Sequence, residues 1–288
     1  MNTRLNHTME IVLMHAVQRG LAAAAGALLL AGNAAAQTGA QTAAQAIAGQ
    51  TGGTAQTSVA VGAEYTTGKF GGTETTDTLY IPVVLRHETG PWVLKATVPW
   101  LRITGPSNVI GGGADRVVLP GASTGRRTES GLGDIVLSGF YNLMDERKGG
   151  LGLDLGGKIK LPTADDTKGL GTGELDYAVQ LDFFRPFDAT TLFGSIGYRV
   201  YGNPPGQTLR DVPYASIGAS YRMSSQQSLG VAYDYRPHIV NGGGEVSEVT
   251  AFWSNRLSPE WKLKLYGVIG FADASPDAGV GMLLERRF

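Results

Sequence analysis

The feature that most constrains this chain is a two-residue alternation of apolar and polar side chains, which recurs from residue 56 to the C-terminus. In the segment 150–161, for example, leucine, isoleucine and glycine fill one face, while Asp154, Lys158 and Lys160 fill the other. Successive side chains of a β-strand point to opposite faces, so a period of two predicts strands rather than helices. Alternation over about ten residues, repeated with turn residues between, is typical of a transmembrane β-barrel.

The alternating segments predict about twelve strands, and their connections alternate between short and long. The strands are expected at 57–67, 76–87, 92–103, 132–143, 150–161, 173–184, 190–201, 212–222, 228–236, 246–257, 261–271 and 279–288. Short periplasmic turns and longer outer loops are typical of bacterial outer-membrane barrels. The predicted fold is therefore all-β: an antiparallel, up-and-down transmembrane barrel that occupies residues 56–288.

A soluble β-sandwich also alternates and is the main structural alternative. Aromatic residues at the ends of the apolar faces, such as Trp92, Trp100 and Trp261, favour the barrel because they are typical of interfacial girdles. The last strand ends on Phe288, which resembles the signal that the barrel assembly machinery reads. Arg286 departs from that signal, and we expect it to lie near the membrane edge.

The N-terminal segment 1–36 is predicted to be a signal peptide. Arg19 is followed by an apolar run at 21–32 and by small residues at 34–36. The apolar run is shorter than the roughly 20 residues that a membrane-spanning helix needs. Residues 37–55 are small, polar and low in complexity, so we expect a flexible tail. Either Met1 or Met14 could begin the chain, and the expected location is the bacterial outer membrane.

Composition excludes several functions. Lys and Arg number 24 against 25 Asp and Glu, which gives a net charge of −1 and no electrostatic basis for nucleic-acid binding. The sequence has no cysteine, and His87 and His238 do not have the spacing of metal ligands. We therefore expect no cofactor, no metal site and no enzymatic activity.

Assigning the apolar face to lipid places many charged side chains in the lumen. Barrels of about 8 strands are filled by side chains and those of 16 to 18 hold a channel, so both a narrow polar pore and a lumen closed by salt bridges are possible here. We expect Lys158 to pair with Asp176, and Lys160 with Glu174, across one hairpin. The candidate lumen and selectivity residues are Arg86, Lys95, Lys158, Lys160, Glu174, Asp176, Asp182, Arg199 and Arg222.

The longest connection, 104–131, is the candidate constriction loop. It contains an apolar patch, Val117 to Pro120, between Arg116 and the pair Arg126–Arg127. One interpretation is disorder, which is common in loops of this length. The other is that the patch folds over the barrel mouth and forms, with the arginines, an apolar gate with a positive rim. The candidate constriction residues are Arg116, Val117, Val118, Leu119, Arg126 and Arg127.

Short motifs distributed over residues 56–288 resemble a known family. They are Tyr65-Thr66-Thr67-Gly68, Leu79-Tyr80-Ile81-Pro82, Thr97-Val98-Pro99-Trp100-Leu101, Gly105-Pro106, Gly131-Leu132-Gly133-Asp134, Lys160-Leu161-Pro162-Thr163 and Gly171-Thr172-Gly173 with Asp176. Their order resembles that of the outer-membrane transporters of the meta-pathway of phenol degradation (MetA-type).

The resemblance implies a barrel that passes small, often aromatic or hydrophobic, compounds across the outer membrane. The expected function is a passive channel whose partners are outer-membrane lipids, the assembly machinery and a small solute. The alternative is a structural or surface-interaction barrel with a closed lumen.

Overall fold

The computed structural model describes residues 55–120, 125–145 and 150–288. The predicted signal peptide, and the predicted tail up to residue 54, lie outside these residues. Within the described ranges, no helix is long and apolar enough to cross a membrane.

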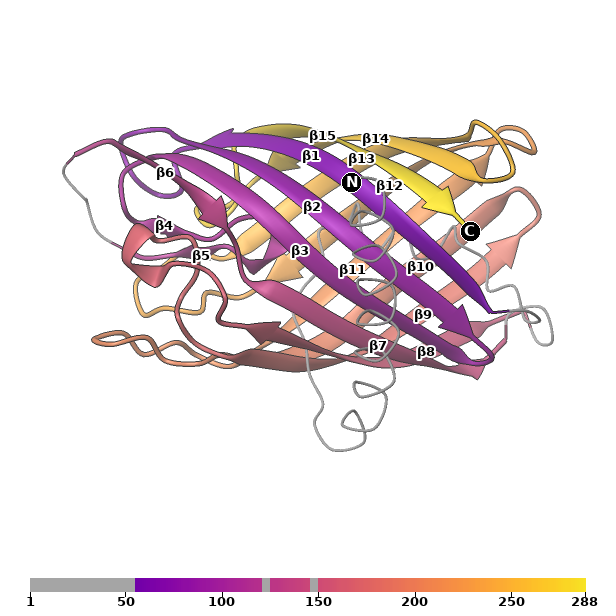
Figure 1. Cartoon of the computed structure of the whole chain (residues 1–288), viewed down its shortest axis with the longest axis horizontal. Coiled ribbons are helices and arrows are strands. Elements are labelled where there is room, and N and C mark those ends of the chain that lie inside the picture. The colour runs from indigo at the N-terminus through magenta and orange to yellow at the C-terminus, as the bar shows by residue number, and fades with distance from the viewer. Residues whose placement is uncertain (1–54, 121–124, 146–149) are drawn as a thin grey trace, which may run out of the picture. The chain divides into compact units, whose positions relative to one another are not determined.

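The described residues form a closed antiparallel barrel (Figure 1). Each strand pairs with its neighbours in the chain, and β1 pairs with both β2 and β15, which closes the barrel. The barrel strands are β1 (Gln56–Gly68), β2 (Thr76–Thr89), β3 (Trp92–Gly105), β6 (Arg127–Leu132), β7 (Ile135–Met144), β8 (Gly152–Leu161), β9 (Asp176–Phe187), β10 (Thr190–Val200), β11 (Val212–Arg222), β12 (Gln227–Arg236), β13 (Val246–Arg256), β14 (Trp261–Gly270) and β15 (Ala278–Arg287).

The strands β6 and β7 together form one barrel strand, interrupted at Gly133 and Asp134. Both pair with β3, and the Gly133 amide donates to the carbonyl of Pro99 at 2.9 Å, so the ladder continues across the break. Counting β6 and β7 as one gives twelve strands, which confirms the predicted fold. The predicted loop 104–131 is shorter than expected, because β3 and β6 extend into it.

The outward face of the barrel carries apolar side chains along each strand and aromatic side chains near both ends. Ile196 and Ile217 in the middle of their strands are 57% and 61% exposed. Because a soluble protein rarely exposes so continuous an apolar surface, this face lies against lipid. The exposed aromatic residues are Trp92, Tyr141, Phe187, Tyr221, Trp261 and Phe288 near the short turns, and Tyr65, Trp100, Tyr177, Tyr198, Tyr235 and Phe271 near the long loops.

Aromatic rings on the inner face lie flat against glycines of neighbouring strands. A Cβ added at Gly230 would overlap the Phe252 ring, and one at Gly197 would overlap the Tyr214 ring. The other such pairs are Phe140 with Gly156, Phe193 with Gly218 and Tyr266 with Gly281. The glycines therefore allow large rings to cover the wall without filling the centre of the barrel.

The predicted pairing of the β8–β9 hairpin is wrong by two residues. Lys160 pairs with Asp176, and Lys158 pairs with Ala178. The prediction assumed a strand that begins at residue 173, but β9 begins at Asp176 and Glu174 belongs to the preceding loop. A shift of two residues preserves the inward direction of the charged side chains.

Candidate functional site

Residues 106–120, hereafter the plug, fold into the long-loop end of the barrel. Two short strands, β4 (Val109–Ile110) and β5 (Val117–Val118), pair with each other around the 3-10 helix η1 (Gly113–Asp115). Gly111 and Gly113 have φ of 70° and 59°, a region that favours glycine. The Gly111 amide donates to the carbonyl of Gly169 at 2.9 Å, which ties the plug to the β8–β9 loop.

Asp115 at the tip of the plug ends a chain of alternating charges on the inner wall. Its Oδ1 lies 3.1 Å from Nη2 of Arg199, whose guanidinium is fully buried. The same Nη2 lies 2.7 Å from Oδ2 of Asp176, and Lys160 Nζ lies 3.3 Å from that oxygen. Lys160 Nζ also lies 2.8 Å from Oδ2 of Asp134. Burial raises the pKa of the Asp115 carboxyl, while the Arg199 charge opposes that rise.

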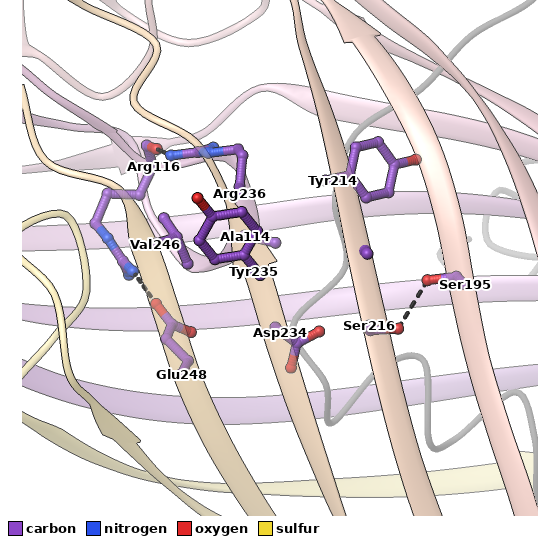
Figure 2. A pocket seen from close by; sticks show the side chains of 11 residues that line it. Ala114, Arg116, Ser195, Tyr214, Ser216, Asp234, Tyr235, Arg236, Val246 and Glu248 are labelled. Carbon is purple, nitrogen blue, oxygen red and sulfur yellow. Dashed lines mark hydrogen bonds and ion pairs between the residues drawn. The ribbon is translucent and has the colours of Figure 1, made fainter.

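Arg116, the next residue, binds a different part of the wall (Figure 2). Its Nη2 lies 2.8 Å from Oε1 of Glu248 on β13, and both side chains are almost completely buried. Its carbonyl accepts a hydrogen bond from Arg236 Nη2 at 3.4 Å. Because Arg199 is on β10 and Glu248 on β13, two consecutive plug residues connect wall strands that are three positions apart in the barrel.

The apolar side chains of the plug are buried between the long loops. Val117 is 1% exposed and packs in an apolar dish. The dish comprises Tyr201, Leu209, Val212, Ile239 and Val240. Val118 packs with Phe70, Val109 and Ala274.

These apolar contacts stabilise the closed position more than the ion pairs do. Burial of each valine is worth about 1.5–3 kcal/mol. A buried ion pair contributes little net stability, because desolvation offsets the attraction. The ion pairs instead determine where the plug can settle, because removing one partner leaves the other buried and uncompensated.

A small cavity lies beneath the plug, between it and strands β10 to β13 (Figure 2). Its volume is about 40 Å³. Ser195 and Ser216 line it and share a hydrogen bond of 2.8 Å between their hydroxyls, and Asp234 and Tyr214 lie beside them. The cavity has room for water but not for a benzene-sized ring, which needs roughly 150 Å³. An organic solute can therefore enter only if the plug moves.

Further toward the short turns, side chains fill the middle of the lumen. Lys158 Nζ donates to Oε1 of Gln180 at 2.7 Å, and the Tyr214 hydroxyl donates to the same oxygen at 2.8 Å. Gln180 Nε2 donates to Asp182. Lys95 Nζ lies 5.4 Å from the centre of the Phe140 ring. Lys158, Gln180 and Asp182 are each no more than 2% exposed.

The structure places the predicted site residues in three groups. Lys158, Lys160, Asp176, Asp182 and Arg199 face the lumen and are buried. Arg86 and Lys95 face the lumen nearer the short turns, where Arg86 Nε lies 2.8 Å from Oε1 of Glu88. Of the loop residues, Arg116, Val117 and Val118 are buried in the plug, and Leu119 packs against the apolar dish.

Four predicted site residues lie elsewhere than expected. Arg126 and Arg127 do not form a positive rim over the lumen: Arg126 Nη2 lies 2.7 Å from Asp77 on the outside of the barrel, and Arg127 donates to the carbonyl of Lys168. Arg222 is exposed and donates to the carbonyl of Asp188 in a short turn. Glu174 is half-buried in the loop before β9.

The candidate residues did not include Asp115 of the plug or Glu248 on β13, each of which forms one of the two ion pairs between plug and wall. An acid directly before Arg116 and the apolar patch was a usable signal for Asp115. For Glu248 the inward face was evident from the alternation, but no local pattern connects it to a loop 132 residues away.

The two histidines in the described ranges lie apart, one beside a short turn and one in the long loops. Nδ1 of His87 bonds the Thr57 hydroxyl at 2.9 Å, and His238 bonds Arg210 in the long loops. Among the described residues no group of His, Asp and Glu is arranged to hold a metal ion.

A barrel with an apolar outer band, aromatic girdles and a polar lumen is an outer-membrane β-barrel. The family model described as "Putative MetA-pathway of phenol degradation" matches residues 37–252, and the chain belongs to this family. Comparison with curated proteins gives no match.

Solved structures with the same fold include an outer-membrane channel from Pseudomonas putida F1. It is 13% identical, with a TM-score of 0.62, and the match covers 83% of this chain and 97% of the channel. The KdgM porin matches at 11% identity and a TM-score of 0.47, covering 80% of this chain and 99% of the porin. The P. putida toluene transporter TodX matches at 11% identity and a TM-score of 0.44, covering 88% of this chain and 93% of the transporter.

Proposed function

We propose that this protein is an outer-membrane channel for the passive uptake of small aromatic or hydrophobic molecules, closed at its outer mouth by the plug. The observation that carries the proposal is that the plug is attached mainly by side chains. Its two ion pairs and the packing of Val117 in the apolar dish hold it to the wall, while β4 and β5 pair only with each other. Such a segment can leave without breaking the barrel ladder.

Family membership supports a role in handling phenolic compounds, and the similar P. putida F1 structure is of an outer-membrane channel. The aromatic rings along the inner wall also fit a small aromatic solute, because ring pairs attract one another beyond simple burial. Nothing in this role requires a catalytic group, so we infer a channel rather than an enzyme.

A barrel with a permanently closed lumen is the second candidate. The nearly complete burial of Lys158, Gln180 and Asp182 favours it, because these side chains fill the centre of the lumen below the plug. The channel requires that they rearrange once the plug has left.

Planar-bilayer recordings separate the two candidates. We expect discrete openings from the wild-type barrel, and longer ones when residues 109–118 are replaced by a Gly/Ser linker of equal length. An aromatic solute should then block the ion current briefly as it passes. In a control, the exposed residues 205–207 are replaced by Gly/Ser, and its openings should match those of wild type. If the folded wild-type and linker proteins are both silent, the closed-lumen candidate is correct.

A further inference from the structure

The guanidinium of Arg199 has unused hydrogen-bond donors. Its Nη2 serves both Asp176 and Asp115, while Nε and Nη1 are buried and have no hydrogen-bond partner. Arginine typically binds a carboxylate through two nitrogens at once. Arg199 therefore has the capacity for a better-placed carboxylate than the one Asp115 supplies.

The apolar dish lies directly beside this guanidinium. The Tyr201 ring belongs to the dish, and its centre lies 4.4 Å from Cζ of Arg199. Val117 of the plug occupies the dish. The plug thus presents a carboxylate and an apolar side chain, two residues apart, to a cation and an adjoining apolar surface.

We propose that Arg199 and the apolar dish form a binding site for small apolar or aromatic carboxylates, which Asp115 and Val117 occupy in the closed state. This inference rests on the proposed function and specifies the substrate class. The ligand exchanges with the plug without any covalent step: its carboxylate replaces that of Asp115, and its apolar body replaces Val117.

The local charge explains why a carboxylate is favoured over a neutral hydrocarbon. Arg199 and Lys160 face Asp134, Asp176 and Asp115. Exchange of one carboxylate for another preserves this balance. A neutral hydrocarbon would leave Nε and Nη1 of Arg199 buried without an acceptor, which costs free energy in a poorly hydrated site.

Benzoate binding to the full-length folded barrel in neutral detergent micelles, measured by saturation-transfer NMR at pH 7.5, tests the site. We expect Val117→Ala to bind benzoate several-fold more tightly than wild type, because a weaker seat releases the plug more readily. Arg199→Lys should bind benzoate about tenfold more weakly, because lysine keeps the charge but lacks the planar guanidinium that binds a carboxylate through two nitrogens. Arg126→Gln, which changes an exposed arginine outside the lumen, should bind like wild type.

Equal benzoate affinity in wild type, Val117→Ala and Arg199→Lys would overturn the proposal. So would equally tight binding of benzyl alcohol, which has the ring but no carboxylate. If Arg199→Lys does not fold, Val117→Ala decides alone, because unfolding cannot produce a gain in specific affinity. Micelle binding needs no conduction, so a silent barrel that binds benzoate refutes only the channel. A conducting barrel without carboxylate preference refutes only the site.

Discussion

At the scale of single residues, glycine has as much influence on this barrel as the charged side chains do. Phe252 can lie against the wall only because Gly230, on the next strand, has no side chain. The ring would otherwise project further into the lumen, and its centre already lies 6.4 Å from that of the Phe193 ring. Wall glycines therefore determine how much of the lumen remains for charged groups and solute.

Gly230→Ala is expected to reduce the free energy of unfolding by about 1–3 kcal/mol, because the added methyl group overlaps the Phe252 ring. Urea titration of the refolded barrel in lipid vesicles measures this loss. Gly267→Ala is the matched control: its nearest neighbour would be a carbonyl oxygen at 3.6 Å, so it should be neutral or slightly stabilising. Equal losses in both variants would show that the ring does not depend on the glycine.

At the scale of elements, the plug differs from the strands around it because side chains rather than a backbone ladder hold it in place. Two consecutive residues, Asp115 and Arg116, form ion pairs with strands three positions apart, and Val117 packs in the apolar dish. This arrangement makes the closed position specific while leaving it separable from the barrel.

The plug should also respond to pH. The pKa of Asp115 is raised when the plug is seated, chiefly by burial, and returns toward its ordinary value when the plug is in water. The seated state therefore binds the proton more tightly, so acidification favours closure and a rise in pH through the raised pKa favours opening. The groups that face Asp115 are Arg199, Lys160, Lys158 and Asp176.

Open probability in bilayers, measured between pH 4 and 7.5, checks this expectation. It should fall toward the acidic end in wild type. Asp115→Asn, which cannot titrate, should lose most of that dependence. A wild-type response in Asp115→Asn would assign the pH effect to other carboxylates.

At the scale of the whole molecule, lipid and lumen impose opposite requirements on alternate residues of each strand. Ile196 in the middle of β10 faces lipid, so Ile196→Arg should destabilise the barrel by about 2–4 kcal/mol. Phe187, at the short-turn end of the neighbouring strand β9, is the control, and Phe187→Arg should cost about 0–1 kcal/mol. Refolding titrations into lipid vesicles compare the two, and equal costs would contradict the assigned membrane position.

The alternation of the sequence was enough to predict the strands and the direction of their side chains, because both are local properties. Lys158 and Lys160 were placed correctly on the inner face for that reason. Their partners were not, because pairing depends on where β9 begins after a long loop, and Glu174 continues the pattern without belonging to the strand.

The path of the plug depended on contacts that no local pattern encodes. The apolar patch at Val117 and Val118 predicted burial, but the positions of Arg116 and Asp115 follow from Glu248 and Arg199, which lie far along the chain. The glycine–aromatic pairs could not be predicted from the sequence either, because they depend on the register between neighbouring strands.

The most direct test of the account is to fix the plug in place and release it during one recording. The chain has no cysteine, so Arg116→Cys with Glu248→Cys introduces a single pair. A short bis-methanethiosulfonate joins the two thiols, each thiolate displacing a sulfinate to form a disulfide that a reductant can cleave. We predict that the cross-linked barrel is silent in a planar bilayer and that discrete openings begin when a reductant is added. Openings of equal size and frequency before and after reduction would show that the plug does not close the channel.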